Sequence, residues 1–235
     1  MGEETRAPTT SQWKLRRLAK RSIAVFNRHA GVSGAIAAYQ GSLIPRAEAY
    51  IQAYDAAALY EPRWRKEIAE GRGAMFALLT SINAWKPHLA RELPGFDIAT
   101  IGDKPTVPED LVEDGERLAD GLEMIVDGEG VTLPWATGGA TELRTKADDA
   151  ERETEEAAAA DSTLSELLAT VRRTGVELEQ DLTLFRKTLR SVLGRSHPDF
   201  QKLRVEKASK PDDDDDPNGP QPSPPVTPAP EPPQG

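Results

Sequence analysis

The three histidines are the side chains of this sequence best suited to acid–base catalysis or metal binding. In helical proteins such sites pair inward carboxylates with histidine, often as Glu-x-x-His. None of His29, His88 and His197 has a glutamate three residues before it. His29 falls on an apolar stripe, which favours a place in the core, and His88 lies four residues before Glu92, a spacing typical of a surface pair on a helix. His197 follows Gly194, a pattern typical of the turn that ends a helix.

Other motifs for catalysis or cofactor binding are also missing from the sequence. The chain has no cysteine, which excludes disulfides, thiolate zinc sites, iron–sulfur clusters and cysteine nucleophiles. The close glycines Gly71 and Gly73 lack the Lys-Ser/Thr ending of a phosphate-binding loop, and no serine lies in a Gly-x-Ser-x-Gly elbow. We therefore predict no catalytic, cofactor-binding or metal-binding residue, and we expect a protein that is not an enzyme.

The composition favours a soluble, helical protein. Its 235 residues suit one domain or at most two, and 29% of them are charged while only 6% are aromatic. No stretch approaches the roughly eighteen consecutive apolar residues that a membrane-spanning helix needs. The acidic start is not followed by an apolar run, so we expect no signal peptide and a cytoplasmic protein.

Apolar residues at alternating three- and four-residue spacing predict an all-α fold. The longest run extends from Leu143 to Val192 through seven heptads, and it becomes rich in Leu, Val and Phe after Leu164. We expect an elongated antiparallel helical bundle with coiled-coil-like packing. Its predicted helices span about 11–30, 33–59, 62–93, 107–127 and 141–193.

Prolines and glycines place the ends of the predicted helices. Pro62 fits the first turn of a helix, and Pro94 with the following glycine fits a helix stop. A break near Gly31 or Pro45 divides the N-terminal segment. Residues 131–139 are predicted to form a turn-rich linker.

Two capping-box patterns bear on the C-terminal half of the chain. Residues 106–109 form one such pattern and predict the start of the fourth helix. Residues 163–166 form the second, so a break near Asp161 is an alternative to one long last helix.

The chain divides into a helical bundle and two end segments. We expect the bundle at residues 11–206 and disorder at 1–10 and 207–235. The C-terminal tail contains five consecutive aspartates, Asp212–Asp216, followed by a proline-rich run that cannot bury enough apolar surface to offset its chain entropy. The tail is interpreted as a solubilising segment, or alternatively as a recognition segment with PxxP spacing.

Charges of opposite sign are segregated along the sequence, whose net charge is −10. Eight basic residues and no acid lie between Thr5 and Ala47, whereas residues 92–161 carry twenty acids and five bases. One interpretation is that these blocks pair within the bundle and determine which helices are neighbours. The other is that the basic helix binds an anionic partner such as an acidic protein, nucleic acid or a membrane surface. Nucleic acid is the weaker choice, because the extensive acidic surface would repel phosphate.

From these patterns we expect a non-enzymatic helical scaffold, adaptor or assembly subunit that acts through helix–helix contacts with a protein partner or with itself. The alternative is a surface-binding module whose basic N-terminal helix docks on an anionic partner. The candidate partner-binding residues are cations near the start of the chain and apolar residues near the end of the long seam: Lys14, Arg16, Arg17, Lys20, Arg21, Leu178, Leu182, Phe185 and Leu189.

Overall fold

The regular elements of the protein are helices. The computed structural model describes residues 7–99, 101–102 and 107–203. Within these ranges one isolated bridge, between Val126 and Thr132, is the single β-type pairing. The predicted all-α fold class is confirmed, whereas the prediction for the tail at 207–235 lies outside the described residues.

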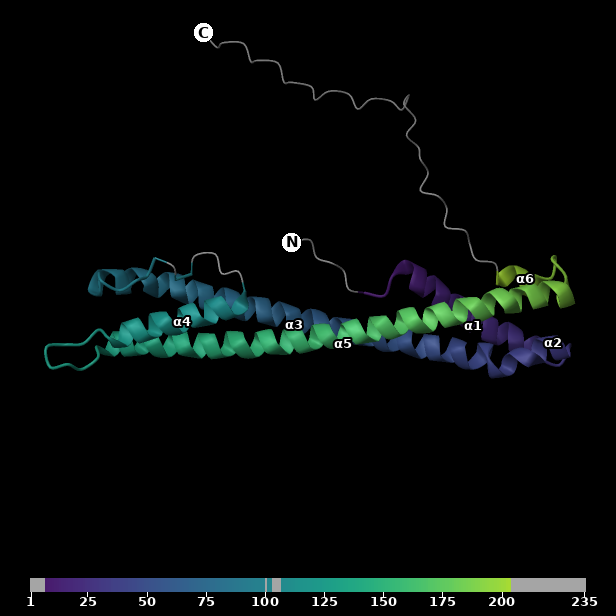
Figure 1. The fold of residues 1–235 in the computed structure, drawn as a ribbon, viewed down its shortest axis with the longest axis horizontal. Coiled ribbons are helices and arrows are strands. Elements are labelled where there is room, and N and C mark those ends of the chain that lie inside the picture. Colours follow the sequence, from purple (N-terminus) through teal and green to yellow (C-terminus); the bar gives the residue numbers. More distant parts are fainter. Residues whose placement is uncertain (1–6, 100, 103–106, 204–235) are drawn as a thin grey trace, which may run out of the picture. The chain divides into compact units, whose positions relative to one another are not determined.

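Two long helices form the frame of the fold. Helix α3 (Leu43–Glu92) and helix α5 (Pro134–Leu193) run antiparallel and lie side by side (Figure 1). At about 1.5 Å per residue, their 50 and 60 residues extend roughly 75 and 90 Å. Apolar residues of α5 are buried at alternating three- and four-residue spacing, so the heptad pattern of the sequence corresponds to the contact between these two helices.

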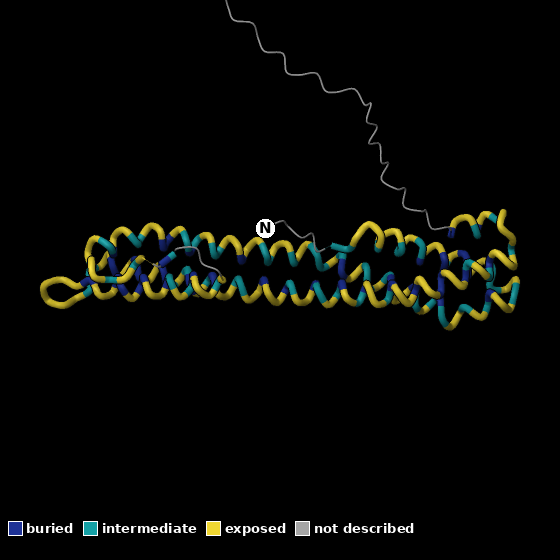
Figure 2. Tube along the Cα trace, turned by 45° about the horizontal axis from the view of Figure 1, so that its top comes forward, coloured by how far each residue is buried: buried dark blue, intermediate teal, exposed yellow. Residues whose placement is uncertain are grey.

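Shorter helices cover the frame near its two ends and create two separate cores (Figure 2). In the first core, Tyr50 and Phe185 are fully buried where α3 and α5 meet the N-terminal helices. In the second core, Leu118 and Leu143 are fully buried between the frame and α4. The short helices are α1 (Thr10–His29), α2 (Gly34–Ala37), the 3₁₀ helix η1 (Ala38–Gly41), α4 (Pro108–Glu123) and α6 (Pro198–Lys202).

The predicted helices 33–59 and 62–93 are wrong, because α3 continues without interruption through Pro62. A proline inside a helix removes one backbone hydrogen bond and costs about 3 kcal/mol. Packing against α5 on both sides of Pro62 compensates for that cost: Ala57 is buried before the proline, and the Trp64 indole donates a hydrogen bond to the Asp161 carboxylate after it, at 3.1 Å. The chain breaks near Gly31, one of the two predicted positions, because α1 ends at His29 and α2 and η1 precede α3.

The start of α5 also differs from the sequence prediction. The helix begins at Pro134, in the first-turn position that proline tolerates, and not at Thr141. Residues 134–139 are therefore helical, where a linker was expected. Gly139 lies against the Trp85 ring, since a Cβ atom there would come within 2.9 Å of the ring. The alternative break near Asp161 is absent, because α5 is continuous to Leu193.

Candidate protein-interaction surface

Helix α1 is fixed to the frame by its apolar side. A capping box starts the helix: the Thr9 hydroxyl accepts from the Gln12 backbone N–H, and the Gln12 side chain accepts from the Thr9 N–H. Val25 and Phe26 are buried in the first core. The opposite side of the helix, which carries basic residues and no acid, is therefore turned toward solvent.

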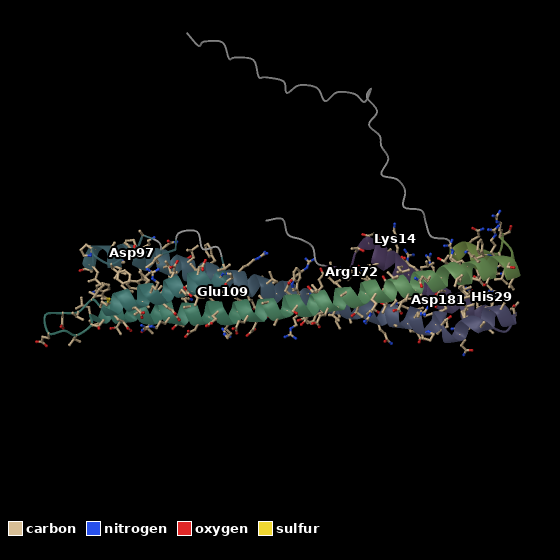
Figure 3. The ribbon with its side chains drawn as sticks, viewed as in Figure 1. Lys14, His29, Asp97, Glu109, Arg172 and Asp181 are labelled. Carbon is tan, nitrogen blue, oxygen red and sulfur yellow. The ribbon has the colours of Figure 1, made fainter. Side chains whose placement is uncertain are left out.

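Four cations make up this outer side, which we call the basic face: Lys14, Arg17, Lys20 and Arg21. All four are exposed, and none is in an ion pair among the described residues. The Arg17 guanidinium lies over the Trp13 ring, 4.7 Å from its centroid, and Trp13 is itself 42% exposed. Figure 3 shows Lys14 on this outer side. The basic face is thus a surface of uncompensated positive charge with one aromatic side chain beside it.

Arg16, although predicted to bind a partner, is occupied within the chain. Its guanidinium donates two hydrogen bonds to the Asp55 carboxylate on α3, at 2.5 and 3.0 Å. These bonds raise the pKa of Arg16 above its ordinary value. Arg16 also lies over the Tyr54 ring, 5.4 Å from the centroid. The prediction for Arg16 is therefore corrected: the side chain joins α1 to α3.

The four apolar candidates on α5 are also corrected, because all of them are buried inside the protein. Leu178, Leu182, Phe185 and Leu189 belong to the first core. The Phe185 ring contacts the ring of Tyr39, with 5.2 Å between centroids. These four positions of the heptad seam therefore pack on the protein's own helices.

A polar cluster that the sequence analysis did not anticipate fastens α6 to the end of α1. The buried Asp199 carboxylate contacts His29 Nε2 at 2.9 Å, and it accepts hydrogen bonds from Arg28 at 2.9 Å and from Lys202 at 3.3 Å. These donors, His29 first, hold the pKa of Asp199 below its ordinary value. The partners are up to 171 residues apart in the sequence, so no local pattern signals their meeting.

The same cluster is poorly suited to bind a metal ion. Ligand atoms of His29, His197 and Asp199 all lie within 4.8 Å of one another. However, His197 Nδ1 already accepts a hydrogen bond from the Asp199 backbone N–H at 3.2 Å. Two positive side chains, Arg28 and Lys202, also surround the carboxylate. A cation would have to displace these bonds and approach these charges, so we interpret the cluster as a structural latch.

His88 lies in different surroundings from those predicted. Its ring contacts the indole rings of Trp85 and Trp135, with 5.6 and 6.2 Å between centroids. Glu92 instead accepts hydrogen bonds from Arg91. The predicted pair of His88 and Glu92 is therefore wrong, and the histidine is part of an aromatic group at the far end of α3.

Two hollows of about 280 and 410 Å³ lie beside the α3–α5 pair. Both are open, and their walls combine alanine with charged side chains of both signs, for example Glu70 and Lys146 in the smaller hollow and Arg63 and Glu156 in the larger. In neither do a nucleophile and a base converge as catalysis requires. In the part of the chain that the structure describes, the basic face is therefore a better candidate for a binding surface than either hollow.

Among the described residues, the opposite charge blocks do not pair as the first interpretation proposed. The described carboxylates that bind α1 are Asp55 and Asp199, and both lie outside the acidic block at 92–161. The acidic helix α4 packs near Leu78 of α3, whereas α1 is tied to Asp55, and these points are about 35 Å apart along the helix. Figure 3 shows Lys14 and Glu109 on different halves of the frame.

No protein-family model, curated protein or solved structure matches this chain significantly. Within the described ranges, no helix is both long and apolar enough to cross a membrane. A helical fold by itself does not define a function.

Proposed function

We propose that this protein is a non-enzymatic scaffold or adaptor that binds an acidic protein through the basic face of α1. The observation that carries the proposal is the contrast among the cations of this helix. Arg16 and Arg28 are committed to Asp55 and Asp199, whereas the four cations of the basic face have no carboxylate partner among the described residues. Unpaired like charges on one helix repel each other and destabilise the isolated protein slightly. Binding of a partner of opposite charge reduces this repulsion.

The frame supports this role by holding the basic face rigidly. The apolar side of α1 is buried, and Arg16 and the latch around Asp199 fix its position near both ends. A surface held in one conformation loses little entropy when it binds. Trp13 adds an exposed aromatic side chain of the kind that is enriched at protein interfaces.

An acidic protein fits the charge pattern better than nucleic acid does. The chain as a whole carries a charge of −10, and residues 92–161 alone carry twenty acids against five bases. A long polyanion would meet this acidic block as well as the basic face, whereas a compact acidic surface can contact the basic face alone. A cytoplasmic location belongs to the same proposal.

The test is affinity capture from the native host with the full chain as bait. Replacing Arg17 and Arg21 by glutamine should remove the captured acidic partner, because the basic face loses half of its charge. The matched control replaces Lys66 and Arg72, two exposed cations of α3, by glutamine and should retain it. If capture is the same for the two double variants, the proposal is wrong.

A further inference from the structure

The outer side of α4 carries a surface that is the electrostatic counterpart of the basic face. Its apolar side, including Leu111 and Leu118, is buried in the second core. Acidic residues at three- and four-residue spacing face solvent on the other side. This acidic face comprises Glu109, Glu113, Glu116, Asp120 and Glu123, all of them exposed.

Three of these five carboxylates are in no ion pair among the described residues. Arg144 of α5 binds both Asp120 and Glu123. No ion pair among the described residues includes Glu109, Glu113 or Glu116. The unpaired part of the acidic face therefore consists of three carboxylates, opposite in sign to the four unpaired cations of α1.

Three of the four cations have the same spacing as the three unpaired carboxylates. Lys14, Arg17 and Arg21 are separated by three and then four residues, which is about 4.5 and 6 Å along a helix. Glu116, Glu113 and Glu109, taken in reverse order, have the same separations. Two antiparallel helices would therefore place Lys14 opposite Glu116, Arg17 opposite Glu113 and Arg21 opposite Glu109, in the manner of charged flanking pairs in coiled coils.

We infer that the acidic protein bound by the basic face is a second copy of this chain, with α1 of one copy antiparallel to α4 of the other. The inference rests on the proposed function, since it names the partner of the same surface. The two faces cannot neutralise each other within one chain, because they are attached to α3 about 35 Å apart. Each copy carries both faces, so an association of copies can satisfy both.

The net charge of −10 makes two copies repel each other at long range. A change of ionic strength separates this repulsion from the attraction between the basic face and the acidic face. At about 0.1 M salt the Debye length is roughly 10 Å, so repulsion between distant charges is screened while pairs in contact still attract. Association should therefore be measurable at this ionic strength and weaker at about 0.5 M.

Charge reversal tests the inference through the mass of the full chain in sedimentation equilibrium at about 0.1 M salt. One variant carries Arg17→Glu and Arg21→Glu, and the other carries Glu109→Arg and Glu113→Arg. Each variant alone should associate at least about tenfold more weakly than the unmodified chain, because like charges face each other. An equimolar mixture should associate as the unmodified chain does, since reversed α1 then meets reversed α4, and the unmodified faces meet each other.

Reversal of Lys66 and Arg72 to glutamate is the matched control and should leave the association unchanged. The inference is overturned if the unmodified chain is a monomer throughout, or if the mixture associates no better than its components. The capture experiment separates this outcome from failure of the proposed function. If the chain is a monomer and its capture of a protein depends on Arg17 and Arg21, the basic face binds a foreign acidic partner. If the chain is a monomer and capture does not depend on these two residues, the result contradicts both proposals.

Discussion

Gly71 of α3 lies directly against Ala157 of α5: a Cβ atom on Gly71 would be 3.2 Å from the Ala157 Cβ and 3.1 Å from the Glu153 carbonyl oxygen. This close approach occurs between the two cores, since Ala150 of α5 belongs to the second core and Leu164 to the first. Small residues let the helix backbones come together there, so dispersion contacts between backbones replace the large side chains that fill the two cores.

The first prediction follows from this contact. Replacing Gly71 by leucine should lower the free energy of unfolding by about 1–3 kcal/mol, because the added side chain forces α3 and α5 apart. Gly73 is the matched control, since a Cβ atom there meets nothing within 4 Å. Leucine at Gly73 should stabilise α3 by up to about 1 kcal/mol through helix propensity. Urea denaturation of both variants checks the prediction, and equal effects would contradict it.

The second prediction concerns the seam of α5, where neighbouring residues have opposite environments. Phe185 is fully buried and Leu184 is 52% exposed. Phe185→Ala should lower the free energy of unfolding by about 3–5 kcal/mol, as expected for an aromatic side chain removed from a core. Leu184→Ala should change it by no more than about 0.5 kcal/mol. A small effect at Phe185, together with loss of partner binding, would instead place that side chain in an interface.

The third prediction is a pH dependence at the latch. Because the folded state lowers the pKa of Asp199 below its ordinary 3.8, the ionised carboxylate stabilises the fold above that pH, and the contribution is lost as the pH falls through the lower folded-state pKa. Asp199→Asn should therefore cost about 1–3 kcal/mol at neutral pH and progressively less below about pH 4. The exposed Asp148→Asn is the control. A stability difference at Asp199 that persists unchanged in acid would rule out the ionised carboxylate as its source.

The helical fold could be predicted from the sequence because its signal is local and repeated. From Leu143 to Leu189, residues at three- and four-residue spacing lie on the buried side of one helix. A single exception therefore does not hide the period. The proline at position 62 is a single local signal of the opposite kind. Packing of α3 on α5 outweighs this signal, and local helix propensity contains no information about such packing.

The surface could be predicted only in part. The cations of α1 are visible in the sequence, but Asp55 and Asp199, which distinguish Arg16 and Arg28 from the others, lie 39 and 171 residues away. Likewise, the spacing of Leu178 and Phe185 indicates that these side chains pack against a helix, and it contains no information on whether that helix belongs to the same chain. Contacts between distant residues decide both questions, and one sequence does not contain them.

The dissociation constant of the captured acidic partner, measured for three forms of the full chain at low ionic strength, tests the central claim most directly. If the basic face binds the partner, the Arg17→Gln/Arg21→Gln chain should bind at least about tenfold more weakly than the unmodified chain, and Lys66→Gln/Arg72→Gln should bind as the unmodified chain does. Equal affinities for the two double variants would contradict the account.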